Sequence, residues 1–152
     1  MNDRLKSLYQ KVILTKAKEE RFVGTLEGYT HVITAYNPLC GDKYELQIIV
    51  EDGVVKSLKY SGSGCSISKA STAVLCERLN GESADEVLPE IQRFLELVDS
   101  ESDRPPDQIT KEETLLAFAA ARDFPERKSC ANLAWKEVQK QFRKLFPNHS
   151  KG

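Results

Sequence analysis

The chain has 152 residues, of which 22 are Lys or Arg and 23 are Asp or Glu, so its formal net charge is −1. That length suits one domain with its own core, here residues 1–152, and the near-neutral balance argues against a protein that binds nucleic acid. No apolar run approaches a membrane span and no signal-peptide segment is recognisable, so we expect a cytoplasmic protein that does not contact membranes.

The first half of the chain has the pattern of a helix followed by three strands. Apolar residues at three- and four-residue spacing within residues 4–20 predict an amphipathic helix. Residues 29–36 are rich in β-branched and aromatic side chains, and residues 44–50 alternate between apolar and polar. Asp52-Gly53 is typical of a two-residue turn, from which residues 54–60 return as the partner strand.

The second half has helical periodicity interrupted by glycine and proline. A helix that begins after Cys65 should stop at Gly81. A capping box at residues 83–86 introduces another helix, which we expect to restart at Pro89 and to continue to Val98.

Further helices and two irregular segments complete the chain. The acidic, proline-containing residues 99–109 predict a surface loop, and a capping box at residues 110–113 should open a helix that Pro125 breaks. The last helix carries an apolar stripe, whereas residues 148–152 have nothing to bury and predict a flexible tail. Strands first and helices after indicate an α+β fold, with a small antiparallel three-stranded sheet packed against helices on one face.

Candidate metal ligands lie at the ends of these predicted elements. They are Cys40, Asp42, Cys65 and Cys130. Gly41 allows a sharp turn, so that Cys40 and Asp42 on either side of it can face one metal ion. Gly64 precedes Cys65 at a helix N-terminus, where the positive end of the helix dipole favours a thiolate. We place the fourth ligand in the first turn of the last helix, with Arg127 on the same side adding positive charge.

These ligands leave several uses open. Three thiolates and a carboxylate supply the four ligands of tetrahedral zinc, but the same thiols can carry sulfur or hold an iron–sulfur cluster. The cysteines can also be ordinary buried residues, although none of the three lies on an apolar stripe. Cys76 differs, because it lies mid-helix among apolar residues, and we interpret it as core packing. Reduced cytosolic thiols argue against a disulfide framework.

Three segments of the chain resemble the IscU/SufU family of iron–sulfur biogenesis proteins. They are Asn37-Pro38-Leu39-Cys40-Gly41-Asp42, Gly62-Ser63-Gly64-Cys65-Ser66-Ile67-Ser68, and Phe124 to Cys130 with Leu133-Ala134-Trp135. The chain is similar to the SufU branch because Ser129 stands where IscU proteins carry a histidine, and because the stretch between the second and third cysteines is longer. It departs from the family at residues 15–21, where a His-Tyr…Asn-Pro-Arg-Asn pattern is usual.

The resemblance to SufU proteins implies a zinc-dependent sulfurtransferase that works with a partner and is not a stand-alone catalyst. It implies zinc held by Cys40, Asp42, Cys65 and Cys130, with Cys40 as the sulfur acceptor. The implied partners are a pyridoxal-phosphate cysteine desulfurase of the SufS type, near Arg127, and downstream iron–sulfur assembly proteins. The alternative is an IscU-like scaffold on which the same ligands hold a transient [2Fe–2S] cluster. A purely structural zinc domain fits less well, since such sites are usually closed by Cys and His.

Overall fold

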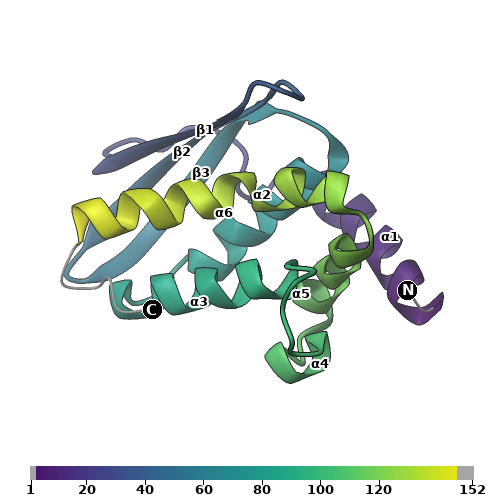
Figure 1. Cartoon of the computed structure of the whole chain (residues 1–152). Helices are drawn as coiled ribbons and strands as arrows, with labels where there is room; N and C mark the ends of the chain where they lie inside the picture. The colour runs from purple at the N-terminus through teal and green to yellow at the C-terminus, as the bar shows by residue number, and fades with distance from the viewer. Residues whose placement is uncertain (1–2, 147–152) are drawn as a thin grey trace.

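A three-stranded antiparallel sheet forms one layer of the molecule and helices form the other (Figure 1). The computed structural model describes residues 3–146. The strands lie in the order β1-β2-β3, with bounds β1 (His31–Asn37), β2 (Asp42–Glu51) and β3 (Val54–Ser63). The expected α+β class and the hairpin across Asp52-Gly53 are confirmed.

Strand β2 shows why one face of the sheet is covered and the other is open. Its alternate side chains at Asp42, Tyr44, Leu46 and Ile48 are buried, whereas Lys43 and Glu45 between them are exposed. Because successive side chains of a strand point to opposite faces, one set packs on the helices and the other meets solvent. Asp42 is the polar member of the buried set, and it lies at the end of the sheet.

Four longer helices form the helical layer. They are α1 (Asp3–Ala17), α2 (Ser66–Leu79), α3 (Ala84–Leu97) and α6 (Pro125–Leu145). Helices α2 and α6 pack on the buried face of the sheet, α1 packs against α2 and α3 packs against α6. Trp135 of α6 stacks on Phe94 of α3, with ring centroids 3.9 Å apart and an interplanar angle of 5°. Its indole Nε1 donates to Ser71 Oγ of α2 at 2.9 Å. This one side chain therefore fixes the last helix against two others.

The expected restart of a helix at Pro89 is wrong. Helix α3 begins after its N-cap Ser83, whose Oγ accepts a hydrogen bond from the Asp85 backbone N–H at 3.3 Å, and it runs through Pro89. A proline removes one backbone donor. Burial of neighbouring apolar residues such as Ile91 and Phe94 outweighs that loss and keeps the helix continuous.

The region between α3 and α6 contains more helix than the expected loop over residues 99–109. Residues 106–109 form the one-turn helix α4 (Pro106–Ile109), and Ile109 is only 9% exposed. The capping box predicted at residues 110–113 is also wrong, because α5 (Glu113–Ala117) begins at its last residue. A 3-10 helix, η1 (Phe118–Asp123), follows, and Pro125 is the first residue of α6.

The irregular part of this region is held by arginine side chains. Arg122 donates to the backbone carbonyls of Glu96, Leu97 and Arg104 at 3.0, 2.8 and 2.9 Å. Arg104 and Ser102 donate to the Glu96 carboxylate at 2.9 and 2.8 Å, and these hydrogen bonds lower the pKa of Glu96 to about 2. The segment is therefore anchored, although its side chains are polar.

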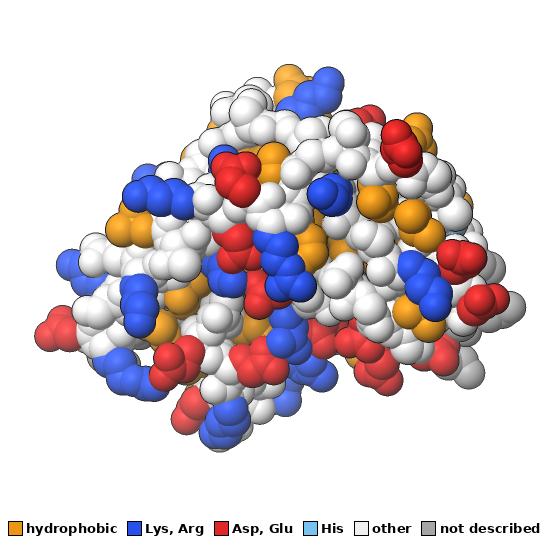
Figure 2. All heavy atoms as spheres, turned by 180° about the vertical axis from the view of Figure 1, so that it is seen from behind, with side chains coloured by type: hydrophobic (Ala, Val, Ile, Leu, Met, Phe, Trp, Pro, Cys, Tyr) orange, Lys and Arg blue, Asp and Glu red, His pale blue; other side chains and the backbone are white. Residues whose placement is uncertain are grey.

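The ends of the chain and its surface add two findings. The first helix ends at Ala17, three residues before the predicted limit, and the tail predicted at residues 148–152 lies outside the described residues. None of the described helices combines the length and apolar character that crossing a membrane requires. On the face shown in Figure 2, acidic, basic and hydrophobic side chains are interspersed.

Candidate metal centre

The turn between β1 and β2 presents the first two candidate ligands. Asn37 accepts two hydrogen bonds within this turn. Its Oδ1 accepts from the Leu39 N–H at 3.0 Å, and its backbone carbonyl accepts from the Gly41 N–H at 2.8 Å. Gly41 has a φ of +76°, in the left-handed region that residues with a Cβ rarely adopt. Cys40 is therefore exposed on the turn, while Asp42 is only 1% exposed at the start of β2.

The loop after β3 brings the third candidate ligand onto Asp42. Cys65 is the N-cap of α2, and its backbone N–H donates to Asp42 Oδ1 at 2.9 Å. Its Sγ accepts from the Ser68 N–H at 3.5 Å. Gly64 is needed because a Cβ at that position would lie 2.5 Å from Asp42 Oδ1 and equally close to Tyr44 and Ser68. Backbone contact thus sets the position of this sulfur.

The fourth candidate ligand comes from α6. Cys130 is the sixth residue of that helix and not part of its first turn, so that expectation is wrong. It is 7% exposed, and the ligand atoms of Cys40, Asp42 and Cys130 all lie within 4.8 Å of one another. Cys65 Sγ adjoins this group, 4.0 Å from Asp42 Oδ2. The fold therefore gathers residues separated by up to ninety positions in the sequence.

Protons are held tightly at two of these sulfurs. Cys40 Sγ donates to Asp42 Oδ2 at 3.0 Å, and this hydrogen bond to a carboxylate raises the pKa of Cys40. Burial and the neighbouring Cys65 raise the pKa of Cys130 to about 12. Without a metal ion, burial therefore favours the protonated Cys130, contrary to the thiolate expected at this position. A metal ion must displace the protons of these thiols to bind.

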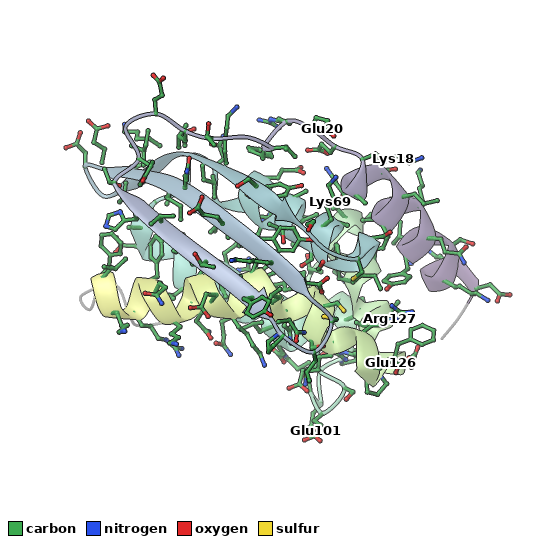
Figure 3. The ribbon with its side chains drawn as sticks, turned by 90° about the horizontal axis from the view of Figure 1, so that it is seen from above. Lys18, Glu20, Lys69, Glu101, Glu126 and Arg127 are labelled. Carbon is green, nitrogen blue, oxygen red and sulfur yellow. The ribbon has the colours of Figure 1, made fainter. Side chains whose placement is uncertain are left out.

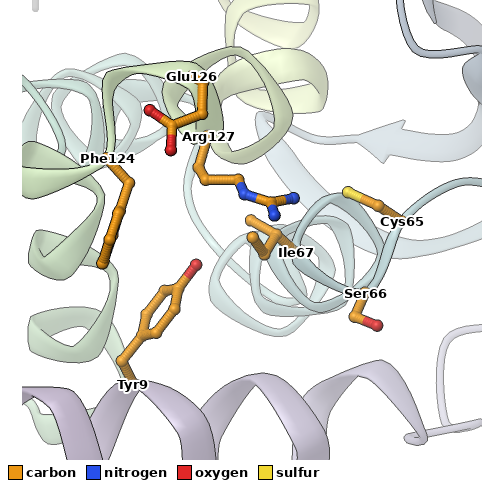
Figure 4. Close-up of a pocket in the computed structure, with 7 residues that line it drawn as sticks. All are labelled: Tyr9, Cys65, Ser66, Ile67, Phe124, Glu126 and Arg127. Atoms are coloured by element: carbon orange, nitrogen blue, oxygen red, sulfur yellow. The ribbon is translucent and has the colours of Figure 1, made fainter.

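Arg127 lines a cavity of about 510 Å³ that Cys65 also lines. Its guanidinium points toward Ile67 and Cys65 (Figure 4). Tyr9 of α1 reaches the same cavity, where burial raises the pKa of its phenol and the charge of Arg127 acts in the opposite direction. In Figure 3, Glu126 and Arg127 lie at the first turn of α6, at the exposed end of the site.

Three residues around the centre were missed by the sequence analysis. Tyr9 carried no signal, because one aromatic residue in an amphipathic helix is typical of core packing. Tyr44 and Ser68 share a hydrogen bond of 2.8 Å beneath the centre. Ser68 had a detectable signal, since it stands three residues after the N-cap Cys65 and its N–H reaches back to that cap. Cys76, by contrast, is fully buried as expected.

The chemistry of this donor set fits zinc. Zinc is borderline soft and takes four ligands from sulfur, nitrogen and carboxylate oxygen. Cys40, Asp42 and Cys130 lie within 4.8 Å of one another, and Cys65 supplies a further sulfur beside Asp42. Asp42 contributes the one hard donor, which suits a site that exchanges a ligand more than a closed structural site.

Comparison with known proteins identifies relatives over nearly the whole chain. Residues 8–131 match the family model described as NifU-like N terminal domain. An iron–sulfur cluster assembly scaffold protein IscU from Thermotoga maritima is 34% identical over 92% of this chain and 96% of its own length. A zinc-dependent sulfurtransferase SufU from Bacillus subtilis is 30% identical over 91% of this chain and 92% of its own length.

A solved structure agrees with these relatives. The crystal structure of FiSufU from Fervidobacterium islandicum AW-1, described as an iron–sulfur cluster assembly scaffold for the SUF system, superposes with a TM-score of 0.77. The match covers 88% of this chain and 95% of that one, at 25% sequence identity. The overall architecture is thus shared with a protein of known structure.

Proposed function

The chain belongs to the NifU-like N-terminal domain (IscU/SufU) family of iron–sulfur cluster assembly proteins, and we propose that it acts there as a zinc-dependent sulfur acceptor. In this proposal a SufS-type cysteine desulfurase supplies sulfur as a persulfide, and Cys40 receives it. The sulfur then passes to downstream iron–sulfur assembly proteins. The similarity to the Bacillus subtilis protein named zinc-dependent sulfurtransferase SufU supports this role.

The observation that carries the proposal is the graded accessibility of the three sulfurs. Cys40 is exposed on its turn, Cys65 is half-buried and Cys130 is buried. A sulfur acceptor must reach into the active site of another protein, and among these thiols Cys40 is the one that can do so without unfolding a helix. Leu39 beside it is 96% exposed, so the tip of the turn projects from the surface.

The transfer itself is a thiol exchange. The Cys40 sulfur attacks the outer sulfur of the desulfurase persulfide, forms a new S–S bond there and expels the desulfurase cysteine as a thiolate. In the metal-free chain, Asp42 accepts the Cys40 S–H hydrogen bond, which orients that sulfur. Arg127 is exposed at the same end of the molecule, where its positive charge suits a docking partner with acidic groups.

Zinc in this scheme would be held by Cys40, Asp42, Cys65 and Cys130. When bound, it keeps cysteine sulfurs deprotonated and protects them from oxidation. Ser129 supports this reading, because it leaves no histidine next to Cys130 that would add a ligand for a cluster.

Mass spectrometry after turnover tests the proposal. The zinc-loaded chain is incubated with a SufS-type desulfurase and cysteine, and peptides are mapped for an added sulfur. We expect the sulfur on Cys40, and we expect Cys40→Ala to abolish stimulation of the desulfurase, whereas Cys76→Ala should leave it unchanged because that thiol is fully buried. Added sulfur found chiefly on Cys65 or Cys130 would contradict the proposal.

A scaffold for a [2Fe–2S] cluster is the second candidate function. The relative from Thermotoga maritima is named a scaffold protein IscU and is as similar to this chain as the SufU relative. Thiolates are also the usual ligands of such clusters. In that role the cluster is the cargo of the protein, and the four candidate ligands hold it until it is passed on.

A further inference from the structure

We propose that Cys130 is a resolving cysteine for Cys40: in the metal-free protein it attacks a Cys40 persulfide, releases sulfide and leaves a Cys40–Cys130 disulfide. The inference rests on the proposed function, because that function places sulfur on Cys40. It adds an activity to the site, namely reduction of the bound sulfur to sulfide by the chain itself.

The positions of the two sulfurs carry this inference. Their Sγ atoms lie within 4.8 Å of each other, with Cys40 exposed on its turn and Cys130 buried on the inner side of α6. In a persulfide on Cys40, the inner sulfur is the Cys40 Sγ atom. Cys130 attacks this atom, and the structure gives its position. Its outer sulfur can point to solvent, opposite to the buried attacking sulfur. The leaving group therefore departs into water.

The reaction balances without an outside oxidant. Cys40–S–SH and Cys130–SH give Cys40–S–S–Cys130 and H₂S. The bond between the two persulfide sulfurs breaks and the bond between the two Sγ atoms forms. The outer sulfur gains two electrons, which the two cysteine sulfurs lose. Cys130 attacks as a thiolate, so its proton first moves to the Asp42 carboxylate, an oxygen of which lies within 4.8 Å of Cys130 Sγ, and then leaves with the sulfide. A small thiol can then reduce the disulfide at its exposed Cys40 half.

Closing this disulfide requires a small movement of a segment that can move. A disulfide has an S–S length of about 2.05 Å, so the two Sγ atoms must approach by less than about 3 Å. Cys130 is buried within α6, next to buried Ala131, but Cys40 lies on a turn outside the strands. The turn can therefore supply the movement while the helix stays in place.

Cys65 is the less suitable partner although it is nearby. Its sulfur accepts the Ser68 N–H as the N-cap of α2, and its own backbone N–H is bound to Asp42 Oδ1. Both the backbone N–H and the sulfur of Cys65 are thus hydrogen-bonded. Its sulfur also does not belong to the group of ligand atoms from Cys40, Asp42 and Cys130 that all lie within 4.8 Å of one another. The geometry favours the pair of Cys40 and Cys130.

The same geometry predicts opposite behaviour for the zinc-loaded chain. When Cys40 and Cys130 are both metal ligands, the sulfur of Cys130 is not free to attack. The loaded chain should therefore keep a persulfide that the metal-free chain destroys. Metal status would decide whether the protein transfers sulfur or releases it as sulfide.

An aromatic disulfide reagent that releases coloured thionitrobenzoate tests the inference without a desulfurase. One equivalent is added to metal-free protein, where it should label the exposed Cys40 and release one equivalent of colour. Attack by Cys130 then releases a second equivalent in a slower phase, whose rate does not depend on protein concentration. Peptide mapping should find a Cys40–Cys130 disulfide, and the zinc-loaded protein should lack the second phase.

Variants and a persulfide probe complete the experiment. Cys65→Ser in metal-free form should keep the second phase, whereas Cys130→Ser should lose it while its circular dichroism stays native. Glutathione persulfide should yield sulfide and the same disulfide on the wild type. A label that stays on Cys40, a disulfide to Cys65, or added sulfur that moves intact to Cys130 would each overturn the inference. Because no desulfurase is present, these outcomes are separate from failure of the proposed function.

Discussion

Gly64 packs against Asp42 so closely that a methyl group at position 64 would lie 2.5 Å from the Asp42 Oδ1 atom. That oxygen also accepts the backbone N–H of Cys65 at 2.9 Å. Because Gly64 has no side chain, the candidate ligands Asp42 and Cys65, which come from different segments, can lie this close together. The site is built as much by backbone contact as by its ligand side chains.

Gly64→Ala should weaken metal binding without removing any ligand. The added methyl group must displace Asp42, Tyr44 or Ser68, which costs about 1–3 kcal/mol of stability as in other overpacked sites. We expect a lower zinc affinity in competition with a chromogenic chelator. Ser63→Ala is the control, because Ser63 is exposed and its change should leave the affinity as it is. Equal affinities for the glycine variant and the wild type would contradict the close packing described above.

Zinc removal should destabilise the protein, and Cys76 should play no part in it. Binding at residues from separate segments stabilises the folded chain because the unfolded chain lacks the site. We expect one zinc per chain after gentle purification and a lower melting temperature after chelation. Cys76→Ala should keep the zinc content while losing on the order of 1 kcal/mol of stability through the cavity it leaves. A melting temperature unaffected by strong chelators would count against the metal centre.

Asp42→Ala should separate sulfur transfer from cluster scaffolding. Asp42 is the hard donor among sulfurs and the hydrogen-bond acceptor of Cys40, so its loss should impair desulfurase stimulation in a transfer protein. In a scaffold, the same change should mainly lengthen the life of a bound cluster. The measurement is anaerobic reconstitution with iron and sulfide, followed by visible absorbance beside desulfurase assays, with Glu45→Ala as a surface control. A transferable wild-type cluster that survives equimolar zinc would favour the scaffold.

Stability should fall as the solution becomes alkaline. Burial raises the pKa of Cys76, and burial together with neighbouring charge raises the pKa of Tyr44 to about 12. A pKa raised in the folded state means that the folded chain holds protons that the unfolded chain releases above about pH 8.5 for Cys and about pH 10 for Tyr. The stabilisation is complete below those values and is lost as pH rises through the folded-state pKa.

Urea unfolding across this pH range measures the effect. Each such group should lower the free energy of unfolding by up to about 1.4 kcal/mol per pH unit once its unfolded form has titrated. Cys76→Ala removes one of these groups, so its stability should fall less steeply between about pH 8.5 and pH 10. If the free energies of unfolding of the variant and the wild type fell equally with pH, the pKa of Cys76 would not be raised in the folded chain.

Arg122 should hold the segment between α3 and α4 in place. Its guanidinium donates to three backbone carbonyls, and Arg122→Met should cost about 1–3 kcal/mol by leaving those acceptors without it. The control is Arg93→Met, since Arg93 forms a partly exposed ion pair with Glu90 at 3.2 Å and donates to no backbone carbonyl of the described residues, so its loss should cost about 0–1 kcal/mol. We also expect faster cleavage after Glu101 by a glutamate-specific protease in the Arg122 variant alone. Equal cleavage rates in the two variants would show that the segment is held by other contacts.

The elements that depend on local pattern could be predicted from the sequence. Alternation over residues 44–50 and the turn at Asp52-Gly53 specify a hairpin, because strand period and turn geometry are properties of neighbouring residues. The position of Cys65 at the start of α2 and the burial of Cys76 follow in the same way. The candidate ligands could be named because their residue types and element ends are visible in the chain.

Only the tertiary structure decided features that depend on contacts between distant segments. Pro89 stays inside a helix because the core holds α3 on both sides of it, and Ile109 is buried through packing that no local pattern reveals. The sequence suggested a thiolate at Cys130, but in the metal-free chain burial next to Cys65 raises the pKa of Cys130, because desolvation opposes the charged form. Tyr9 reaches the cavity beside Cys65 for a similar reason: the docking of α1, not its composition, determines which side chain faces the site.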